Sequence, residues 1–439
     1  MEYKTLKEFC TITKGKTGIM KAIPGKFPLV VTSEERKTHN EFQFEANAVI
    51  VPLVSGTGHG HASIKRIHYQ EGKFALGTIL CAIIPKNENE LNAQFLYHYL
   101  SLVKEKELVG RMKGMANVTL PIKEIEKVPI PILTIEEQLK FVEFYTSLKS
   151  DCNVINIELF HQLSLISQLR QAFLKEAMQG KLVSNETSDG KTGADLLAQI
   201  KTEKEKLIKE KKIKKGKPLP PISEEEIPFD IPENWVWCRL GEICDLITKG
   251  SSPKWQGVKY VDSYEEGILF VTSKNVDYYK IDLTKATFVT ESFNKVEPRS
   301  ILKKGDLLTN IVGGSIGRTA IYDLDYNANI NQAVCLIRLN EILQKFFILK
   351  LFNSDYIISE MFAYQFSPGR ANLSLSNLEN FKIPLPPLEI QNRIVSKLEE
   401  LMTCCDDLET AVKESQNYNA QLLQQVLREA LEVKEVAVK

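Results

Sequence analysis

The sequence predicts an α+β protein with a pseudo-twofold repeat, in which two globular α/β domains are separated by two long helices that form an antiparallel intramolecular coiled coil. Three observations lead to this fold class. The stretch GMANVTLPIKEIEKVPIPIL at residues 114–133 returns as GRANLSLSNLENFKIPLPPL at residues 369–388. A heptad pattern of apolar residues follows each copy. The region before each copy has the length of an ordinary domain, and the two regions share few identities.

The repeat is a duplicated half of the chain rather than a series of short units, because a period of about 255 residues is far longer than that of a solenoid. Downstream, the match continues through both heptad segments. Upstream it is looser. LKEFCTITKG at residues 6–15 resembles LGEICDLITKG at 240–250, and PLVVTS at 28–33 resembles ILFVTS at 268–273.

Four segments follow from this organisation. We expect a first globular domain at 1–133, a central helical spacer and linker at 134–230, a second globular domain at 231–387 and a C-terminal helical spacer at 388–439. The chain has 439 residues, of which 43% are hydrophobic, so each domain can build a core. Residues 201–217 hold nine lysines and three glutamates, which indicates a helix that frays into an extended, solvated connection. A protein partner or a phosphate backbone is the alternative role of these lysines.

Each long helix carries an apolar seam of period 3.5, which is typical of a coiled coil. The expected seam residues are Phe141, Tyr145, Leu148, Cys152, Ile155, Leu159, Ile166, Leu169 and Phe173 in the first helix, and Ile394, Leu398, Leu401, Cys405, Leu408, Val412, Leu422 and Val426 in the second. The polar residues Gln162, Ser415 and Asn419 interrupt the seam and would fix its register at some cost in stability. At about 1.5 Å per residue, the pair would be a rod of about 65 Å. The alternative is that each helix packs against its own globular domain.

The sequence gives no indication of a membrane protein. The longest nearly uncharged apolar runs, at 48–54 and 75–85, are well short of the roughly 20 residues that a membrane helix needs. The start, MEYKTLKEFC, does not resemble a signal peptide. The eight cysteines show no CxxC spacing, so a reducing, cytoplasmic setting is expected.

Enzymatic motifs are also missing, so we predict no catalytic residues. GKT occurs at Gly15 and at Gly190, but neither copy has the earlier glycine that a phosphate-binding loop requires. His59 and His61 are a candidate metal pair without a third ligand, so no metal site is predicted. The tetrapeptides NPPY and DPPY, with which amino-group methyltransferases hold a flipped base, do not occur.

Polar and glycine-containing loops in both domains are suited to DNA. Lysine suits phosphate groups, and Ser, Thr, Asn and Arg can read base edges. The formal net charge is zero, so recognition would be local. The candidates are Lys14, Lys16, Thr32, Ser33, His59, His61, Lys65, Arg111 and Asn117 in the first domain, and Lys249, Ser251, Lys254, Trp255, Ser273, Lys274, Asn310, Ser315, Arg318, Arg370 and Asn372 in the second. For any one of them, an ordinary polar turn is the alternative. Asn117 and Asn372, which both halves share, are equally suited to orienting the strand that follows.

The order of variable domain, long helix, variable domain and long helix resembles the specificity (S) subunit of type I restriction-modification systems. The resemblance spans the chain and depends on FKIPLPPLEIQNRIVSKLEELMTCCDDLE at 381–409, LRQAFLKEAMQGKLV at 169–183 and IPFDIPENWVWCRLGEI at 227–243. The first copy departs from the family where PIPILTIEEQ replaces the expected PLPPLEIQ, although the helix register is kept.

The resemblance implies a noncatalytic subunit of a type I DNA methyltransferase and endonuclease. Two target-recognition domains, at opposite ends of the helix pair, would each read one half of a split, asymmetric sequence in double-stranded DNA. Two methyltransferase subunits would dock on the helices, bind S-adenosylmethionine themselves and methylate adenine N6. Restriction subunits, which use ATP and Mg, would complete the complex for phage defence. This chain would bind no cofactor of its own.

Three other functions remain open from the residues. The chain could be a stand-alone coiled-coil DNA-binding scaffold, a recognition subunit of a related phage-defence system, or a single-chain enzyme. The last fits least well with the missing motifs. The sequence does not specify which bases are read.

Overall fold

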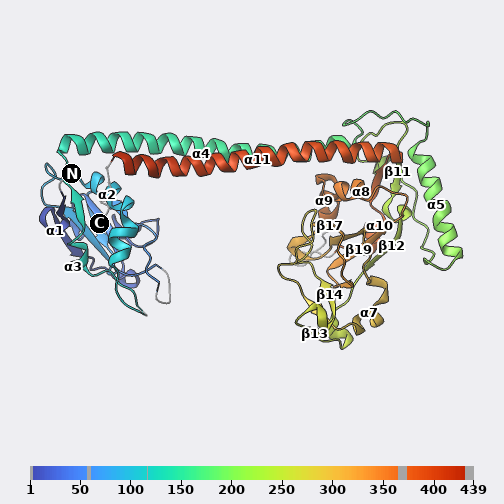
Figure 1. The fold of residues 1–439 in the computed structure, drawn as a ribbon, viewed down its shortest axis with the longest axis horizontal. Helices are drawn as coiled ribbons and strands as arrows, with labels where there is room; N and C mark the ends of the chain where they lie inside the picture. Colours follow the sequence, from blue (N-terminus) through green and yellow to red (C-terminus); the bar gives the residue numbers. More distant parts are fainter. Residues whose placement is uncertain (1–2, 57–60, 116, 364–372, 431–439) are drawn as a thin grey trace, which may run out of the picture. The chain divides into compact units, whose positions relative to one another are not determined.

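The computed structural model describes residues 3–56, 61–115, 117–363 and 373–430. The chain divides into two compact units, one made of Met1–Gln162 with Val412–Lys439 and the other of Leu163–Ala411. The long helices α4 (Ile135–Met178) and α11 (Leu388–Ala430) belong partly to each unit. Each unit therefore holds one globular domain and a length of both helices (Figure 1).

The first domain consists of two four-stranded sheets and one short strand pair. Its strands are β1 (Tyr3–Thr5), β2 (Cys10–Lys14), β3 (Phe27–Val30), β4 (Lys37–His39), β5 (Phe44–Glu45), β6 (Ala48–Pro52), β7 (His68–Gln70), β8 (Lys73–Leu76), β9 (Leu80–Pro85) and β10 (Pro129–Pro131). The strand orders are β2–β9–β6–β7 and β4–β3–β8–β5, and β1 pairs with β10. Its helices are α1 (Leu6–Phe9), α2 (Ala93–Leu102) and α3 (Ile122–Ile125). The apolar run AVIVP becomes the fully buried strand β6, as expected for β-branched residues at the centre of a sheet.

The second domain repeats the topology of the first of these sheets and the strand pair, while its second sheet differs in one edge strand on each side. Its strands are β11 (Val236–Arg239), β12 (Cys244–Lys249), β13 (Tyr260–Val261), β14 (Ile268–Val271), β15 (Phe288–Val289), β16 (Asp306–Asn310), β17 (Thr319–Tyr322), β18 (Ala328–Ile330), β19 (Val334–Leu339) and β20 (Lys382–Leu385). They form the sheets β12–β19–β16–β17 and β13–β15–β14–β18 and the pair β11–β20. The helices of this unit are α5 (Gly193–Lys209), α6 (Leu240–Ile243), α7 (Ser292–Val296), α8 (Lys345–Phe352), α9 (Asp355–Ala363) and α10 (Leu375–Glu379).

The looser upstream repeat is confirmed by this topology. PLVVTS and ILFVTS lie on β3 and β14, and each of these strands makes the one parallel pairing of its sheet, with β8 and β18 respectively. The weak sequence similarity therefore marks equivalent strands of a duplicated domain.

The two long helices pair antiparallel, as predicted (Figure 1). In the first unit, Asn419 Nδ2 of α11 donates a 2.8 Å hydrogen bond to the Cys152 carbonyl of α4. In the second unit, Arg170 of α4 forms ion pairs with Asp406 at 2.7 Å and Glu409 at 3.0 Å. Residue numbers thus rise along one helix as they fall along the other. The buried Asn419 has the register-fixing position that the seam analysis gave it.

The buried seam is narrower than predicted. Apart from Phe141 and Ile394 near the helix starts, which are also buried, one seam residue per heptad is buried on each helix: Tyr145, Cys152, Leu159 and Ile166 on α4, and Leu398, Cys405, Val412 and Asn419 on α11. Of the intervening seam predictions, Leu148, Phe173, Leu401 and Val426 are half-buried. Ile155, Leu169, Leu408 and Leu422 are exposed, so their assignment to the seam is corrected. Two helices that cover each other on a single side bury only a thin strip, and these four residues lie at its border.

The ends of the helices pack against the domains, so the alternative prediction is also correct there. Phe141 packs edge-on against Phe95 of α2, with ring centroids 5.6 Å apart, in the core of the first domain. Ile394 and Leu398 of α11 belong to the core of the second domain. Docking onto the domains therefore takes the first turns of each helix and overlaps the helix pairing at Tyr145 and Leu398.

The lysine-rich linker contains the predicted helix, α5, which lies on the second domain. Leu196, Leu197 and Ile200 bury its apolar face. Lys204 Nζ donates hydrogen bonds to the Gly241 and Glu242 carbonyls, and burial lowers the pKa of this lysine. This lysine is thus a structural contact rather than a solvated one. No helix in the described ranges has the combination of length and apolar character needed to cross a membrane.

Candidate nucleic-acid interface

The predicted DNA-binding loops of each domain gather at one edge of a sheet. Strands β2 and β6 both pair antiparallel with β9, which lies between them, so their C-terminal ends lie at the same edge. In the second domain, β12 and β16 have the same relation to β19. The loops that begin at Gly15 and Gly250 therefore occupy equivalent places.

A glycine shapes the first loop in both domains. A Cβ atom on Gly15 would lie 2.2 Å from the Gly77 carbonyl oxygen, and one on Gly250 would lie 1.7 Å from the Ile330 carbonyl oxygen. Such distances are sterically forbidden, so only glycine lets these loops press against the second sheet. The repeated sequence TKG thus places an exposed lysine, Lys14 or Lys249, just before the loop.

The loop after β3, or after β14, reaches the same place. The Gly77 N–H donates a 3.0 Å hydrogen bond to the Val30 carbonyl, and in the second domain the Asn331 N–H donates one of 3.0 Å to the Val271 carbonyl. Thr32 and Ser33 follow Val30, while Ser273 and Lys274 follow Val271. The structure therefore brings the predicted residues on these two loops together in each domain.

Among the predicted residues of the second domain, Asn310 lies inside the domain rather than at its surface. It is fully buried, and its Nδ2 donates hydrogen bonds to the Ser273 carbonyl at 3.0 Å and to the Val276 carbonyl at 3.2 Å. Asn310 at the end of β16 is therefore placed to hold the loop after β14, not to reach a base. Asn275, which the sequence analysis missed, is also fully buried and holds this loop from within.

The other described candidates of the second domain remain accessible. Trp255 is highly exposed on a short turn that also carries Lys254, and Ser251 is half-buried beside it. An exposed indole next to lysine is suited to stacking on a base near the phosphate backbone. Arg318 is partly exposed and lies 3.6 Å from Asp277. Ser315 is half-buried and donates to the Val312 carbonyl.

In the first domain, most described candidates are exposed: Lys14, Lys16, Thr32, Ser33, His61, Lys65 and Asn117. Arg111 differs, because it is half-buried and forms an ion pair with Glu107 at 2.6 Å. Gln43 fixes the first loop by accepting from the Lys16 N–H and donating to the Lys14 carbonyl. His59, Arg370 and Asn372 lie outside the described residues.

Arg36 was missed by the sequence analysis and ties the loop after β3 to strand β7. Its guanidinium donates to Gln70 Oε1 at 3.1 Å and to the Tyr69 carbonyl at 3.3 Å, and lies 3.1 Å from His68 Nδ1. Burial, together with the charge of Arg36, lowers the pKa of His68 to about 4. A neutral His68 is therefore the acceptor for Arg36 near neutral pH. No local sequence signal points to this pair, because only the sheet brings the two residues together.

Comparison with known proteins places this arrangement in a family. The model described as "Type I restriction modification DNA specificity domain" matches residues 1–163 and again 232–416, so each match covers one domain with a length of long helix. The chain belongs to this family.

Curated specificity subunits of type I restriction enzymes are similar to this specificity-domain protein. EcoEI and EcoAI, both from Escherichia coli, are each 31% identical to it, over 59% and 58% of the chain. These matches span 44% and 43% of the two relatives, less than half of their own length. The EcoBI specificity subunit is 25% identical over 79% of the chain and 66% of its own length.

Solved structures share the whole fold. The HsdS subunit from Thermoanaerobacter tengcongensis matches with a TM-score of 0.55 and 19% identity over 98% of this chain and 96% of its own. A chain from work on complex assembly and conformational transition of the type I R-M system matches with a TM-score of 0.64 and 18% identity over 98% and 97%. The specificity-domain fold with its paired helices is thus shared at low identity.

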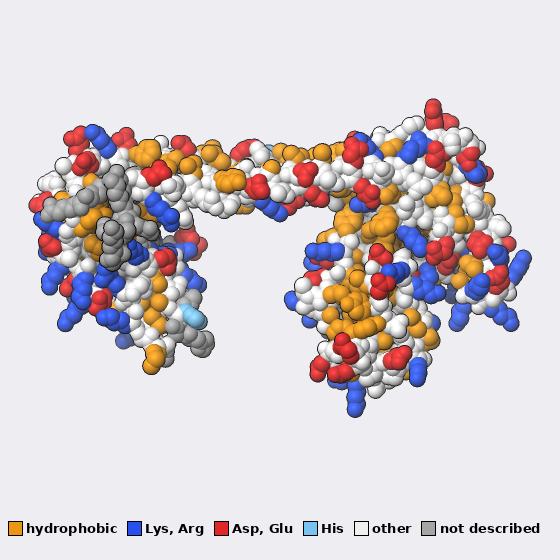
Figure 2. Space-filling view, in the orientation of Figure 1, with side chains coloured by type: hydrophobic (Ala, Val, Ile, Leu, Met, Phe, Trp, Pro, Cys, Tyr) orange, Lys and Arg blue, Asp and Glu red, His pale blue; other side chains and the backbone are white. Residues whose placement is uncertain are grey.

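The helix pair of this specificity-domain protein exposes apolar residues on its outer side (Figure 2). Val154, Ile157 and Phe160 of α4 are 63%, 71% and 65% exposed. Their spacing of three residues aligns them on one side of the helix, away from the buried Cys152 and Leu159. Charged and polar residues normally occupy this side of a two-helix coiled coil, so an exposed apolar row is unusual here.

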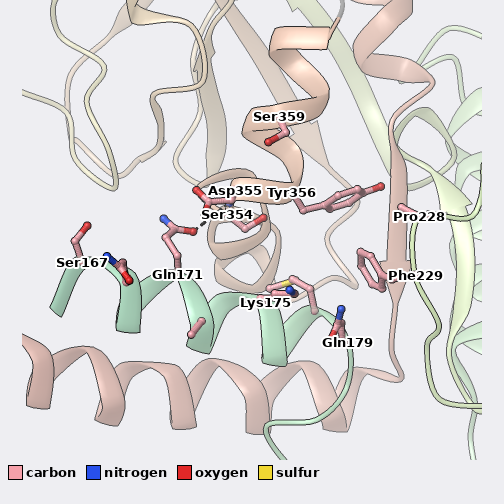
Figure 3. A pocket seen from close by; sticks show the side chains of 13 residues that line it. Ser167, Gln171, Lys175, Gln179, Pro228, Phe229, Ser354, Asp355, Tyr356 and Ser359 are labelled. Carbon is pink, nitrogen blue, oxygen red and sulfur yellow. Dashed lines mark hydrogen bonds between the residues drawn. The ribbon is translucent and has the colours of Figure 1, made fainter. Parts of the chain in front are cut away.

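A pocket of about 740 Å³ in the second unit lies where the first turn of α9 meets α4 (Figure 3). Gln171 of α4 crosses it, accepting a hydrogen bond from the Asp355 N–H at 3.1 Å. Phe229 and Tyr356 form the aromatic part of its wall. The pocket was not predicted from the sequence, because its residues come from α4, the linker and α9. It shows that the second domain rests on α4 as well as on α11.

Proposed function

We propose that this chain is the noncatalytic, sequence-specific DNA-recognition subunit of a type I restriction-modification complex. It reads a bipartite, asymmetric target in double-stranded DNA, with one half-site for each domain. It also carries two adenine-N6 methyltransferase subunits and, in the complete endonuclease, restriction subunits.

One observation supports this function above all. The two domains have the same strand order in the sheet that carries the loops, β2–β9–β6–β7 and β12–β19–β16–β17, and the same glycine-shaped loop at its edge, but residues on that edge differ. In the alignment of the two halves, Lys16 in the first domain matches Ser251 in the second, and Glu34 matches Lys274. A duplicated support with two different reading surfaces suits a target whose halves are unrelated in sequence.

The helix pair supports the scaffolding part of the proposal. Two equivalent copies of a helix present related surfaces, so two identical subunits can bind in equivalent poses. The exposed apolar row at Val154, Ile157 and Phe160 is the first place where we expect a methyltransferase subunit to dock.

The reaction chemistry belongs to the partners in this proposal. S-adenosylmethionine is bound by the methyltransferase subunits, and ATP and Mg are used by the restriction subunits. The missing NPPY-type tetrapeptide and phosphate-binding loop in this chain support that division. The contribution of this chain is positional: it selects the DNA and holds each methyltransferase over one half-site.

The helix pair also sets the distance between the half-sites. Deleting one heptad from each helix, residues 156–162 with 409–415, keeps the seam in phase and shortens the pair by about 10 Å, about three base pairs of duplex. Long-read sequencing of methylated adenines in cells carrying the complete system should show a shorter unread spacer between unchanged half-sites, or lost methylation where the new phase does not fit. Methylation with the wild-type spacer would contradict the proposal.

Two further measurements separate this function from its alternatives. Gel filtration with and without a methyltransferase subunit should show a stable complex, whereas a stand-alone scaffold would bind DNA without one. Methyl transfer from labelled S-adenosylmethionine should require the methyltransferase subunit. Transfer by the purified chain alone would make the chain an enzyme.

A further inference from the structure

Each long helix begins with a buried glutamine. Gln138 is the fourth residue of α4 and is 1% exposed, and Gln391 is the fourth residue of α11 and is 0% exposed. The two occupy aligned positions in the duplicated halves. Full burial of an uncharged but strongly polar side chain is costly unless its amide is fully hydrogen-bonded. A leucine would satisfy packing alone, so the amide itself has a role.

In the first unit, Gln138 joins the start of α4 to helix α2 of the domain. Its Oε1 accepts a 2.8 Å hydrogen bond from the Asn92 N–H, and Asn92 is the residue that caps α2. Its Nε2 donates to the Leu133 carbonyl, five residues earlier in the chain, and to the Glu90 carbonyl, both at 2.9 Å. The Gln138 side chain thus connects the long helix α4 to the segment that follows β10 and to the start of the domain helix α2.

Gln391 repeats these contacts in the second unit. Its Oε1 accepts a 3.1 Å hydrogen bond from the N–H of Gln344, the residue that caps α8. Its Nε2 donates at 2.9 Å to the Pro386 carbonyl, again five residues earlier. The surrounding sequences of the two domains differ, and the partners Asn92 and Gln344 differ in type. The contact is nevertheless the same, because both partners contribute a backbone N–H.

Only an amide performs this task without charge. It donates from nitrogen and accepts at oxygen in one plane, whereas a glutamate would place two acceptors beside backbone carbonyls in a dry site. The N–H that each oxygen accepts would otherwise be an unpaired donor at a helix start. The two glutamines therefore hold the angle between the start of each long helix and the domain that precedes it.

We propose that Gln138 and Gln391 are positioning residues that fix the spacing at which the two half-sites are read. This inference rests on the proposed function of a bipartite reader. Base pairs along one strand are 3.4 Å apart, so a small rotation at a helix start moves the reading edge of a domain by a base-pair step. A locked angle excludes targets whose spacer is one base pair too long or too short.

The test uses the complete methyltransferase complex with Gln138→Met or Gln391→Met in this chain. Methionine keeps the volume and removes the hydrogen bonds. We expect the same two half-site sequences to be methylated, but with the preference for the wild-type spacer over spacers one base pair longer or shorter reduced about tenfold, as the loss of a buried hydrogen bond allows. Long-read sequencing of methylated adenines measures this ratio directly. Loss of stability alone would lower methylation at every spacer equally.

The matched control is Gln425→Met, near the end of α11, where the exposed side chain bonds to Glu429 on its own helix. It should leave the spacer preference unchanged. If a glutamine variant does not fold, Gln344→Pro removes the same donor from the domain side, because Gln344 has a φ of −75° that proline adopts. Folded variants that keep the wild-type spacer preference overturn the inference. A wild-type complex that methylates no bipartite target would instead overturn the proposed function.

Discussion

The helices α4 and α11 are copies of one segment whose inner sides are mostly apolar in both and whose outer sides differ in character. On the inner side, Cys152 is matched by Cys405, and both are buried in the helix pair. On the outer side, the exposed Val154, Ile157 and Phe160 of α4 align with other residues. These are Asp407, Thr410 and Lys413 of α11, all exposed.

If the proposed function is correct, the two sides of the helices make different contacts. The inner side is constrained because each helix must fit the other. Residues on the outer side do not pack against the other helix, so their type can vary with the proposed docking partner. Burial of one large apolar side chain contributes about 1.5–3 kcal/mol, so a row of three on α4 and none at the aligned positions of α11 makes the two docking surfaces unequal. Two identical methyltransferase subunits would therefore bind with different affinities.

The largest effect on methyltransferase binding should come from giving α4 the same outer side as α11. In the triple variant Val154→Asp, Ile157→Thr and Phe160→Lys, α4 receives the residues that α11 has. We expect at least about a hundredfold weaker binding of one methyltransferase subunit, because only part of the apolar contribution needs to be lost. A titration followed by native mass spectrometry should show complexes with one methyltransferase subunit where the wild type has two.

The reciprocal triple variant, Asp407→Val, Thr410→Ile and Lys413→Phe, is the matched control. It should strengthen the weaker site and leave the helix pair intact, since all three residues are exposed. Equal stepwise affinities in the wild type would show that the apolar row does not belong to a methyltransferase contact.

The architecture was readable from the sequence because it depends on periodic patterns. A duplicated half appears as an offset match, and a coiled coil appears as a heptad stripe. Burial within the stripe was less predictable. Ile155 and Leu408 occupy seam positions by spacing but are exposed, because only the crossing of two particular helices decides how wide the buried strip is.

The candidate site shows a similar limit. Lys249 and Trp255 were predicted because basic and aromatic residues in a glycine-rich loop suit DNA, and both side chains are exposed in the structure. Their contact with DNA stays a prediction. Asn310 was proposed for the same chemistry but is buried, because its strand end faces the loop after β14. Arg36 and His68 were missed because their contact is made by the tertiary fold across 32 residues. Residue type indicates what a side chain can bind, and the fold decides whether it faces a ligand or the chain itself.

An intermediate effect on DNA binding is expected at the loop-bearing sheet edge of the second domain. There we expect Arg318 and Lys254 to act differently. Arg318→Ala should change which base is accepted at one position of one half-site, at a cost of about 1–3 kcal/mol, if its guanidinium binds guanine in a bidentate manner. Lys254→Ala should weaken binding to all sequences alike and reduce its salt dependence, as expected for a phosphate contact. Methylome profiling and DNA titrations at several salt concentrations measure both outcomes.

Reversed results would also be informative. A uniform loss of affinity in Arg318→Ala would indicate that Asp277, 3.6 Å away, directs this arginine to the backbone of the DNA. A change of motif in Lys254→Ala would move base reading to the turn that carries Trp255.

The smallest expected effect concerns how the stability of the first unit depends on pH. All six histidines of the chain lie in the first unit. Burial lowers the pKa of His68 to about 4, assisted by the positive charges of Arg36 and Arg66. Burial among aromatic rings, with Lys149 nearby, lowers the pKa of His98 to about 4 as well.

Because an unfolded histidine has a pKa near 6.5, the unfolded chain binds more protons than the folded one between about pH 6.5 and pH 4. The stability from these two neutral histidines is fully present above that window and is lost as the pH falls through it. The midpoint of thermal unfolding should therefore drop more between pH 7.5 and pH 5 in the wild type than in His68→Gln with His98→Gln. His161→Gln, a substitution at an exposed histidine, is the control and should behave as the wild type does. An equal drop in all three proteins would show that carboxylates, which both units contain, account for the acid sensitivity instead.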